Sequence, residues 1–129
     1  MLDLINNAKQ SIEIIMFVWL WYKEDFSCDM SLINHALIRA QRRGVKLRAI
    51  VNFGGAVAVL KEQGIDVRTN DPGTLLHSKM VIVDSAVLAM GSHNFTENAM
   101  NSNIETSMLI EDTEQAKKMK LYFDSLWLS

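Results

Sequence analysis

The stretch HSKMVIVDSAVLAMGSHNFTENAMNSNIE, from His77 to Glu105, decides much of the fold. It contains two apolar runs, Lys79 to Val83 and Val87 to Ser92, with a tripeptide at 84–86 between them. Short runs rich in apolar and β-branched residues on either side of a tight turn are typical of two adjacent β-strands. Polar side chains flank both runs, and burying such groups costs free energy unless they are paired. We therefore expect two strands whose polar ends serve a purpose.

The chain on either side of this stretch alternates between helical and extended patterns. Before it, the periodicity predicts helices over 2–9, 31–43 and 56–63, and strands over 11–20, 45–52 and 65–69. After it, the pattern predicts a strand over 104–111 and a closing helix over 113–126. Alternating helices and strands favour a parallel sheet, and the close-set strands that follow make the sheet mixed. The fold class expected is α/β, with a mixed, largely parallel β-sheet flanked by helices on both faces.

Helix caps can also be predicted from the sequence. Asp29 or Ser31 is a suitable N-cap for the helix over 31–43, because both side chains can accept hydrogen bonds from free amide groups. Gly44 is a natural residue just past its end. Thr113 is expected to cap the closing helix, with Glu114 in its first turn.

Composition limits the possible classes of protein. A chain of 129 residues has the size of one domain, so we expect residues 1–129 to form a single unit. The formal net charge of −2 counts mildly against a nonspecific DNA-binding protein. The lone Cys28 cannot form an internal disulfide. The apolar run over 12–22 is shorter than the roughly 20 residues of a transmembrane helix. We expect no signal peptide or membrane anchor, and a cytoplasmic location.

Three pairs of polar residues fall at strand ends with a spacing of two. Side chains two positions apart on a strand point to the same face. If neighbouring strands align these ends, the six groups converge into an anion site with a cation, amide donors, a hydroxyl, a histidine and a carboxylate. The pairs are His77 with Lys79, Ser92 with Asn94, and Asn103 with Glu105.

The same residues resemble a known family motif. His77-x-Lys79, four residues, Asp84, six residues and Gly91-Ser92-x-Asn94 match HxK(x)4D(x)6GSxN of the phospholipase D superfamily without a mismatch. The resemblance covers about residues 76–105 most strongly, and the order of the flanking elements agrees with its fold. Nearest in appearance are the small endonuclease-like members that carry one motif per chain. The resemblance implies a phosphodiesterase.

The resemblance also implies a role for each residue. His77 would attack phosphorus and form a phosphohistidine, and Lys79 and Asn94 would hold the non-bridging oxygens. Ser92 would donate to the phosphate or to Glu105. Glu105 would accept from His77 Nδ1 and so leave Nε2 free to attack.

Three further residues are expected to support the site. Asp84 has the opposite strand parity from His77 and would anchor the turn, and Gly91 would permit close backbone approach. Asn103 is either a support for the site or an ordinary loop amide. His93, at the variable position of the motif, is expected to point away from Ser92 and Asn94 as a structural or exposed residue.

A single motif supplies one histidine, whereas the reaction needs a second group to protonate the leaving oxygen. The resemblance implies that this group is His77 of a second subunit, in a homodimer with a composite site on its two-fold axis. The chain could equally be one half of a two-motif enzyme. No metal and no other cofactor is expected, since the chain has no CxxC, no HExxH and no clustered carboxylates.

The substrate is less tightly specified than the chemistry. We favour a metal-independent nuclease, because the short loops imply an open site and Arg39, Arg42 and Arg43 form part of a basic patch. These arginines could instead be a solvated helix face. The aromatic segment over 19–22 is core, interface or a base-stacking platform. A phospholipid substrate and an inactive phosphate- or nucleic-acid-binding module are the alternatives.

Overall fold

A computed structural model describes residues 1–129 as a six-stranded mixed sheet in the order β3-β2-β1-β4-β5-β6. The strands are β1 (Ser11–Val18), β2 (Lys46–Phe53), β3 (Asp66–Thr69), β4 (Met80–Val83), β5 (Val87–Gly91) and β6 (Ser107–Glu111). β1, β2 and β3 pair in parallel, whereas β4 is antiparallel to β1 and the last three strands are antiparallel to one another. The predicted mixed α/β sheet is confirmed, but the sheet is not largely parallel. Two of its five pairings are parallel, because the strands after β3 form a hairpin and an antiparallel neighbour without crossover helices.

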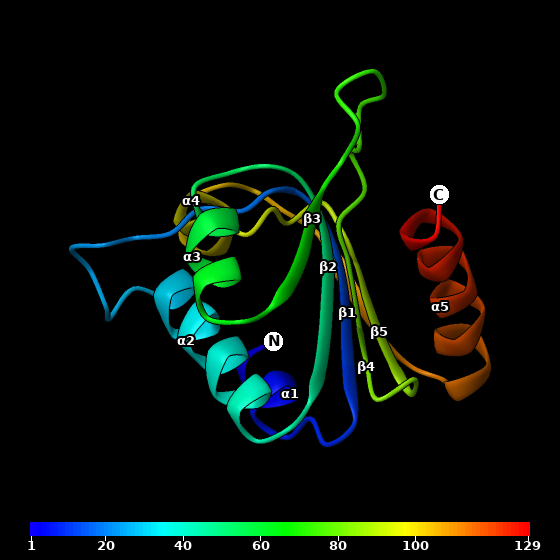
Figure 1. The fold of residues 1–129 in the computed structure, drawn as a ribbon. Coiled ribbons are helices and arrows are strands. Elements are labelled where there is room, and N and C mark those ends of the chain that lie inside the picture. Colours follow the sequence, from blue (N-terminus) through cyan, green and yellow to red (C-terminus); the bar gives the residue numbers. More distant parts are fainter.

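Helices cover both faces of the sheet, as expected (Figure 1). One face carries α1 (Leu2–Asn6), α2 (Asp29–Arg42), α3 (Ala56–Glu62) and α4 (Glu97–Asn101), and the other carries α5 (Thr113–Trp127). The larger core lies beneath the first four helices and includes Ile14, Leu37 and Val81. The smaller core lies beneath α5 and includes Ile15, Ile82 and Phe123. Neighbours in β1 therefore belong to different cores, as strand alternation requires.

Sequence patterns located every helix except α4, and misplaced two helix caps. The N-cap of α2 is Cys28, which makes no side-chain capping bond. Ser31 does not cap the helix, because its hydroxyl donates to the Asp25 carbonyl. The free amide of Met30 donates to Glu97, a residue 67 positions away in sequence. The N-cap of α5 is Asp112 rather than Thr113, and it accepts from the amides of Glu114 and Gln115. None of the helices is long and apolar enough to cross a bilayer.

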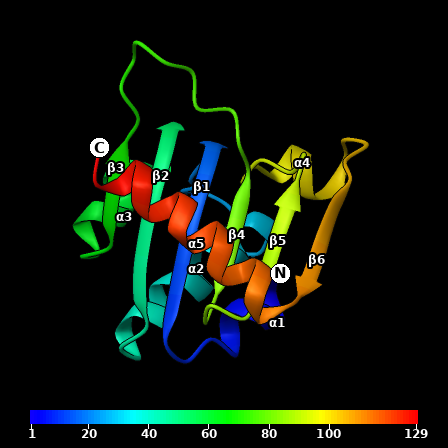
Figure 2. The same cartoon turned by 90° about the vertical axis from the view of Figure 1, so that its right-hand side faces the viewer.

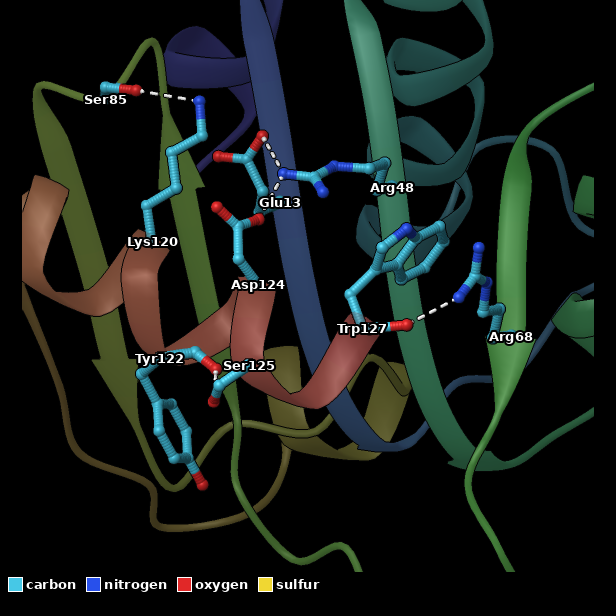
Figure 3. A network of polar contacts seen from close by, with 9 residues as sticks. All are labelled: Glu13, Arg48, Arg68, Ser85, Lys120, Tyr122, Asp124, Ser125 and Trp127. Carbon is cyan, nitrogen blue, oxygen red and sulfur yellow. Dashed lines mark hydrogen bonds and ion pairs between the residues drawn. The ribbon is translucent and has the colours of Figure 1, made fainter. Parts of the chain in front are cut away.

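A partly buried charge cluster fastens α5 to the sheet (Figure 3). Arg48 of β2 lies 2.9 Å from Asp124 of α5 and 3.7 Å from Glu13 of β1, which is 1% exposed. Burial raises the pKa of Glu13, and the positive charges of Lys120 and Arg48 oppose that rise. Lys120 also donates to Ser85 in the turn between β4 and β5. The cluster thus joins α5 to both halves of the sheet.

Asp84 joins the β4–β5 hairpin to the beginning of β1. Asp84 and Ser85 have φ of 55° and 52°, left-handed conformations that reverse the chain in a tight turn, which the Ala86 amide closes by donating to the Val83 carbonyl. The Asp84 carboxylate accepts hydrogen bonds from the amides of Lys9, Gln10 and Ser11, at 2.7 to 3.1 Å. The Asp84 amide donates to the Ser11 carbonyl at 2.8 Å. These bonds fix how β4 pairs with β1.

Replacing Asp84 with alanine should destabilise the protein by about 3 kcal/mol, because three amide groups lose a charged acceptor. Asp84→Asn keeps one acceptor oxygen and tolerates positive φ, so its effect should be smaller. Urea denaturation measures both. Asp71→Ala is the matched control, since Asp71 accepts from Gly73 in an exposed loop. Equal stabilities of the Asp84→Ala and Asp71→Ala variants would contradict the assigned role.

Candidate active site

The polar groups predicted from the sequence meet at one edge of the sheet because of the strand directions. β4 runs antiparallel to β1 and β5, and β5 runs antiparallel to β6. The beginning of β4, the end of β5 and the beginning of β6 therefore lie at the edge where β1 ends (Figure 2). His77 and Lys79 precede β4, Ser92 and Asn94 follow β5, and Glu105 precedes β6. The directions of the strands bring the predicted residues to this edge.

His77 is exposed and lies directly beside Lys79. Lys79 Nζ is 3.1 Å from Nδ1 and 3.4 Å from Nε2 of His77. Phe17, next to the last residue of β1, packs against the His77 ring with a centroid separation of 4.6 Å and lies 5.3 Å from Lys79 Nζ. Partial burial lowers the pKa of Lys79, and the charge of Glu105 opposes this. The imidazole and the ammonium thus share one small volume.

Phe17 is a site residue that the sequence did not single out. It stands in a mostly apolar strand, where a phenylalanine is expected to be part of the core. Only the pairing of β4 with β1 reveals that this phenylalanine faces His77.

Glu105 is held by two side chains of the predicted set. Ser92 Oγ donates to Oε1 at 2.7 Å and Asn103 Nδ2 donates to Oε2 at 3.2 Å. The hydrogen bonds from Ser92 and Asn103 hold the pKa of Glu105 below its ordinary value, and the charges of His93 and Lys79 act in the same direction. The structure contains no hydrogen bond between Glu105 and His77, because Ser92 and Asn103 take the carboxylate while Lys79 faces His77 Nδ1.

Asn94 is fixed by the backbone of β1. Its Oδ1 accepts from the amide of Val18 at 3.2 Å, which leaves Nδ2 as a donor at the edge of the sheet. The isolated bridge between Trp19 and Phe95 continues this pairing. An amide donor and a lysine at the same edge can hold the oxygens of a phosphate.

Gly91 permits the close approach of β5 and β6. A Cβ atom at this position would collide with Ser107 and with the carbonyl of Thr106. The same Ser107 hydroxyl lies 2.6 Å from His93 Nδ1. The His93 ring therefore bonds to β6 and points to the opposite side of the strand from Ser92.

The three predicted arginines lie at the other end of the sheet from His77. They belong to the last turns of α2 and the residue after it, which lead into the start of β2, whereas the site lies where β1 and β2 end. Arg39 donates to Asn6, Arg42 donates to Gln63, and Arg43 donates to the carbonyls of Ile5 and Ala8. They do not converge on the catalytic edge. No cluster of three or more His, Cys, Asp or Glu side chains offers a metal site.

Ser92→Ala should raise the pKa of Glu105 toward the ordinary glutamate value, because Ser92 makes the largest contribution to its depression. A lowered pKa favours the charged carboxylate, so Glu105 stays charged above the ordinary value and loses its charge only as the pH falls further. The variant should lose that charge at a higher pH. A carboxyl-carbon NMR titration measures the change, with Ser102→Ala as the control. An unaltered Glu105 titration in the Ser92→Ala variant would refute this assignment.

Comparison with known proteins gives one family. The family model described as "Cardiolipin synthase, PLD-like domain" matches residues 1–127. Among curated relatives, the chain is 30% identical to a mitochondrial cardiolipin hydrolase of Mus musculus and 34% identical to a phospholipase D of Rickettsia prowazekii. These alignments cover 93% and 88% of this chain, but 53% and 54% of the relatives. The chain thus spans about half the length of these two proteins.

Solved structures show the same fold. The phospholipase D family member Nuc from Salmonella typhimurium superposes with a TM-score of 0.82 at 27% identity, covering 98% of this chain and 83% of that one. NucT from Helicobacter pylori superposes with a TM-score of 0.78 at 20% identity, covering 99% and 85%. The likeness to NucT is one of fold.

Proposed function

The chain belongs to the phospholipase D superfamily of phosphodiester hydrolases, and we propose that it is a metal-independent nuclease that acts through a phosphohistidine at His77. The observation that carries the proposal is the arrangement at the edge of the sheet. An exposed histidine lies 3.1 Å from a lysine, beside an amide donor and a carboxylate that its hydrogen bonds keep charged. These are the groups that phosphoryl transfer through a histidine needs.

The proposed reaction has two displacements at phosphorus. In the first, the Nε2–P bond forms while the bond to the leaving oxygen breaks, and a general acid gives that oxygen a proton. In the second, water attacks the phosphohistidine, the same group takes back a proton, and the P–N bond breaks. Lys79 and Asn94 hold the non-bridging oxygens and offset the charge that develops on them.

The contact between Lys79 and His77 describes the site before substrate binds. A lysine ammonium can only donate, so the ring nitrogen that it bonds must be unprotonated, and Nδ1 at 3.1 Å is nearer to Lys79 Nζ than Nε2 at 3.4 Å. A bound phosphate attracts Lys79 away from the imidazole. The proton can then move to Nδ1, where Glu105 is the carboxylate available to accept it. The hydrogen bond expected from the sequence belongs to that substrate-bound state.

A second copy of the chain is proposed to supply the general acid. The chain has three histidines, of which His35 packs against Trp21 and His93 bonds to Ser107. One His77 per chain thus leaves the site without its acid. Exposed apolar side chains near the site support association of two chains: Met90 on β5, Ile104 before β6, and Met108 on β6, a strand that α5 leaves uncovered (Figure 2). Burying them would stabilise a dimer.

Nucleic acid is the proposed substrate because the site is open and the likeness to Nuc extends over most of both chains. The site lies open at the sheet edge, so a flexible nucleic-acid strand can bring one of its phosphates to His77. A phospholipid is the second candidate. The names of the curated relatives and the exposed apolar residues Phe53, Leu75 and Ile104 at this end of the sheet favour it.

One experiment tests the proposal. The purified protein should cleave single-stranded DNA or RNA in excess chelator, and His77→Ala should reduce the rate by at least about 1000-fold. The control is Lys117→Ala, which should retain activity because Lys117 is an exposed residue of α5 outside the site. Hydrolysis of phosphatidylcholine or cardiolipin vesicles with no cleavage of nucleic acid would show that the protein is a phospholipase and contradict the nuclease proposal. Loss of activity in chelator that Mg²⁺ restores would overturn the metal-free mechanism.

A further inference from the structure

An open groove on the α2 side of the molecule lies apart from the catalytic edge. Its lining consists of Trp21, His35, Ile38, Arg39, Arg42 and Gln63. His35, Arg39 and Arg42 are spaced four and three residues apart, so they form one stripe along α2. The stripe extends for about 10 Å, at 1.5 Å per residue. Gln63, which follows α3, completes the lining beside Arg42.

Arg39 and Arg42 carry charges that no carboxylate balances. None of the ion pairs in the structure includes either residue. Arg39 donates to Asn6 Oδ1 and Arg42 donates to Gln63 Oε1, each at 3.1 Å, so neutral amides orient both guanidinium groups. Each guanidinium has five N–H donors, of which these contacts use one. Arg48, in contrast, is paired with Asp124 and Glu13.

Trp21 provides an aromatic surface at the other end of the stripe. Trp19 and Trp127 are buried at 0% and 7% exposure, whereas Trp21 is partly exposed. An edge-to-face contact with His35 fixes the indole ring of Trp21, with ring centroids 5.2 Å apart and ring planes at 69°. On its other side His35 lies 5.8 Å from Phe26, which is 64% exposed. A fixed, accessible indole is suited to stacking against a base.

A short stretch of chain connects this groove with the catalytic edge. Asn94 accepts from the amide of Val18, and Trp21 follows Val18 by three residues. Three Cα steps of about 3.8 Å place the two backbone positions within about 11 Å. A strand whose phosphate lies at Asn94 can therefore reach Trp21 with its next bases and α2 with the phosphates beyond.

We propose that this groove binds single-stranded nucleic acid, with a base stacked on Trp21 and backbone phosphates held by Arg39 and Arg42. The proposal rests on the proposed nuclease function and adds a binding site for the part of the strand outside the catalytic centre. Unbalanced guanidinium groups next to an exposed aromatic ring are the combination that single strands bind. A lipid tail would find one aliphatic side chain there, Ile38, which is itself buried.

The test measures binding without cleavage, in the His77→Ala background. An oligonucleotide of about 16 nucleotides should quench the tryptophan fluorescence, and adding Trp21→Phe should abolish the quenching because the other two tryptophans are buried. Trp21→Ala should weaken binding at least fivefold. Arg39→Gln with Arg42→Gln should reduce the slope of log affinity against log salt by about 1.4. Lys117→Gln with Lys118→Gln removes two charges from α5 and should leave the slope unchanged.

Steady-state kinetics with His77 intact complete the test. The double arginine variant should raise KM for the 16-nucleotide strand, leave kcat unchanged, and hydrolyse a strand of about 4 nucleotides like the wild type. Cleavage that is insensitive to all groove substitutions would overturn the groove while the nuclease stands. Quenching and a salt slope that depend on the groove, in a protein that cleaves no nucleic acid, would support the groove and overturn the nuclease. Groove-dependent binding to anionic vesicles alone would overturn the proposal.

Discussion

The hydrogen bonds of Asp84 to the beginning of β1 are the constraint on which the rest of the structure depends. They join two halves of a sheet that are built differently, a parallel half from alternating strands and helices and an antiparallel half from a hairpin and β6. Once the hairpin turn is held at the start of β1, the start of β4 must lie at the end of β1. That places His77 and Lys79 beside Phe17 and brings Asn94 to Val18. The position of the catalytic residues, where β1 ends, thus depends on the Asp84 hydrogen bonds where β1 begins.

The sequence predicted the residues of this edge well because the strand spacing and the motif spacing are both short and strict. A spacing of two places side chains on one face of a strand, and the motif fixes which strands carry them. Nearly every strand and helix was anticipated to within a few residues for the same reason. The exceptions have tertiary causes. Cys28 begins α2 because Ser31 is bound to Asp25, and the free amide of Met30 has its partner on α4, far along the chain.

The charged residues were the least predictable part of the site. Arg48 follows Arg42 by only six residues, yet it is partly buried beneath α5 with Glu13 and Asp124. Sequence position cannot distinguish an arginine paired across a core from one that faces solvent, because the partner residues come from β1 and α5. Likewise, the Lys79 contact with His77 depends on which rotamers the substrate-free site favours. Both distinctions required coordinates.

The central claim is that one chain holds half of an active site. Refolding wild-type protein together with the His77→Ala variant, over a range of mixing ratios, tests it directly. If both copies of His77 serve one composite site, only dimers of two wild-type chains are active, and activity per total protein falls with the square of the wild-type fraction. A linear fall, with an active monomer in equilibrium sedimentation, would show that one chain suffices and contradict the account.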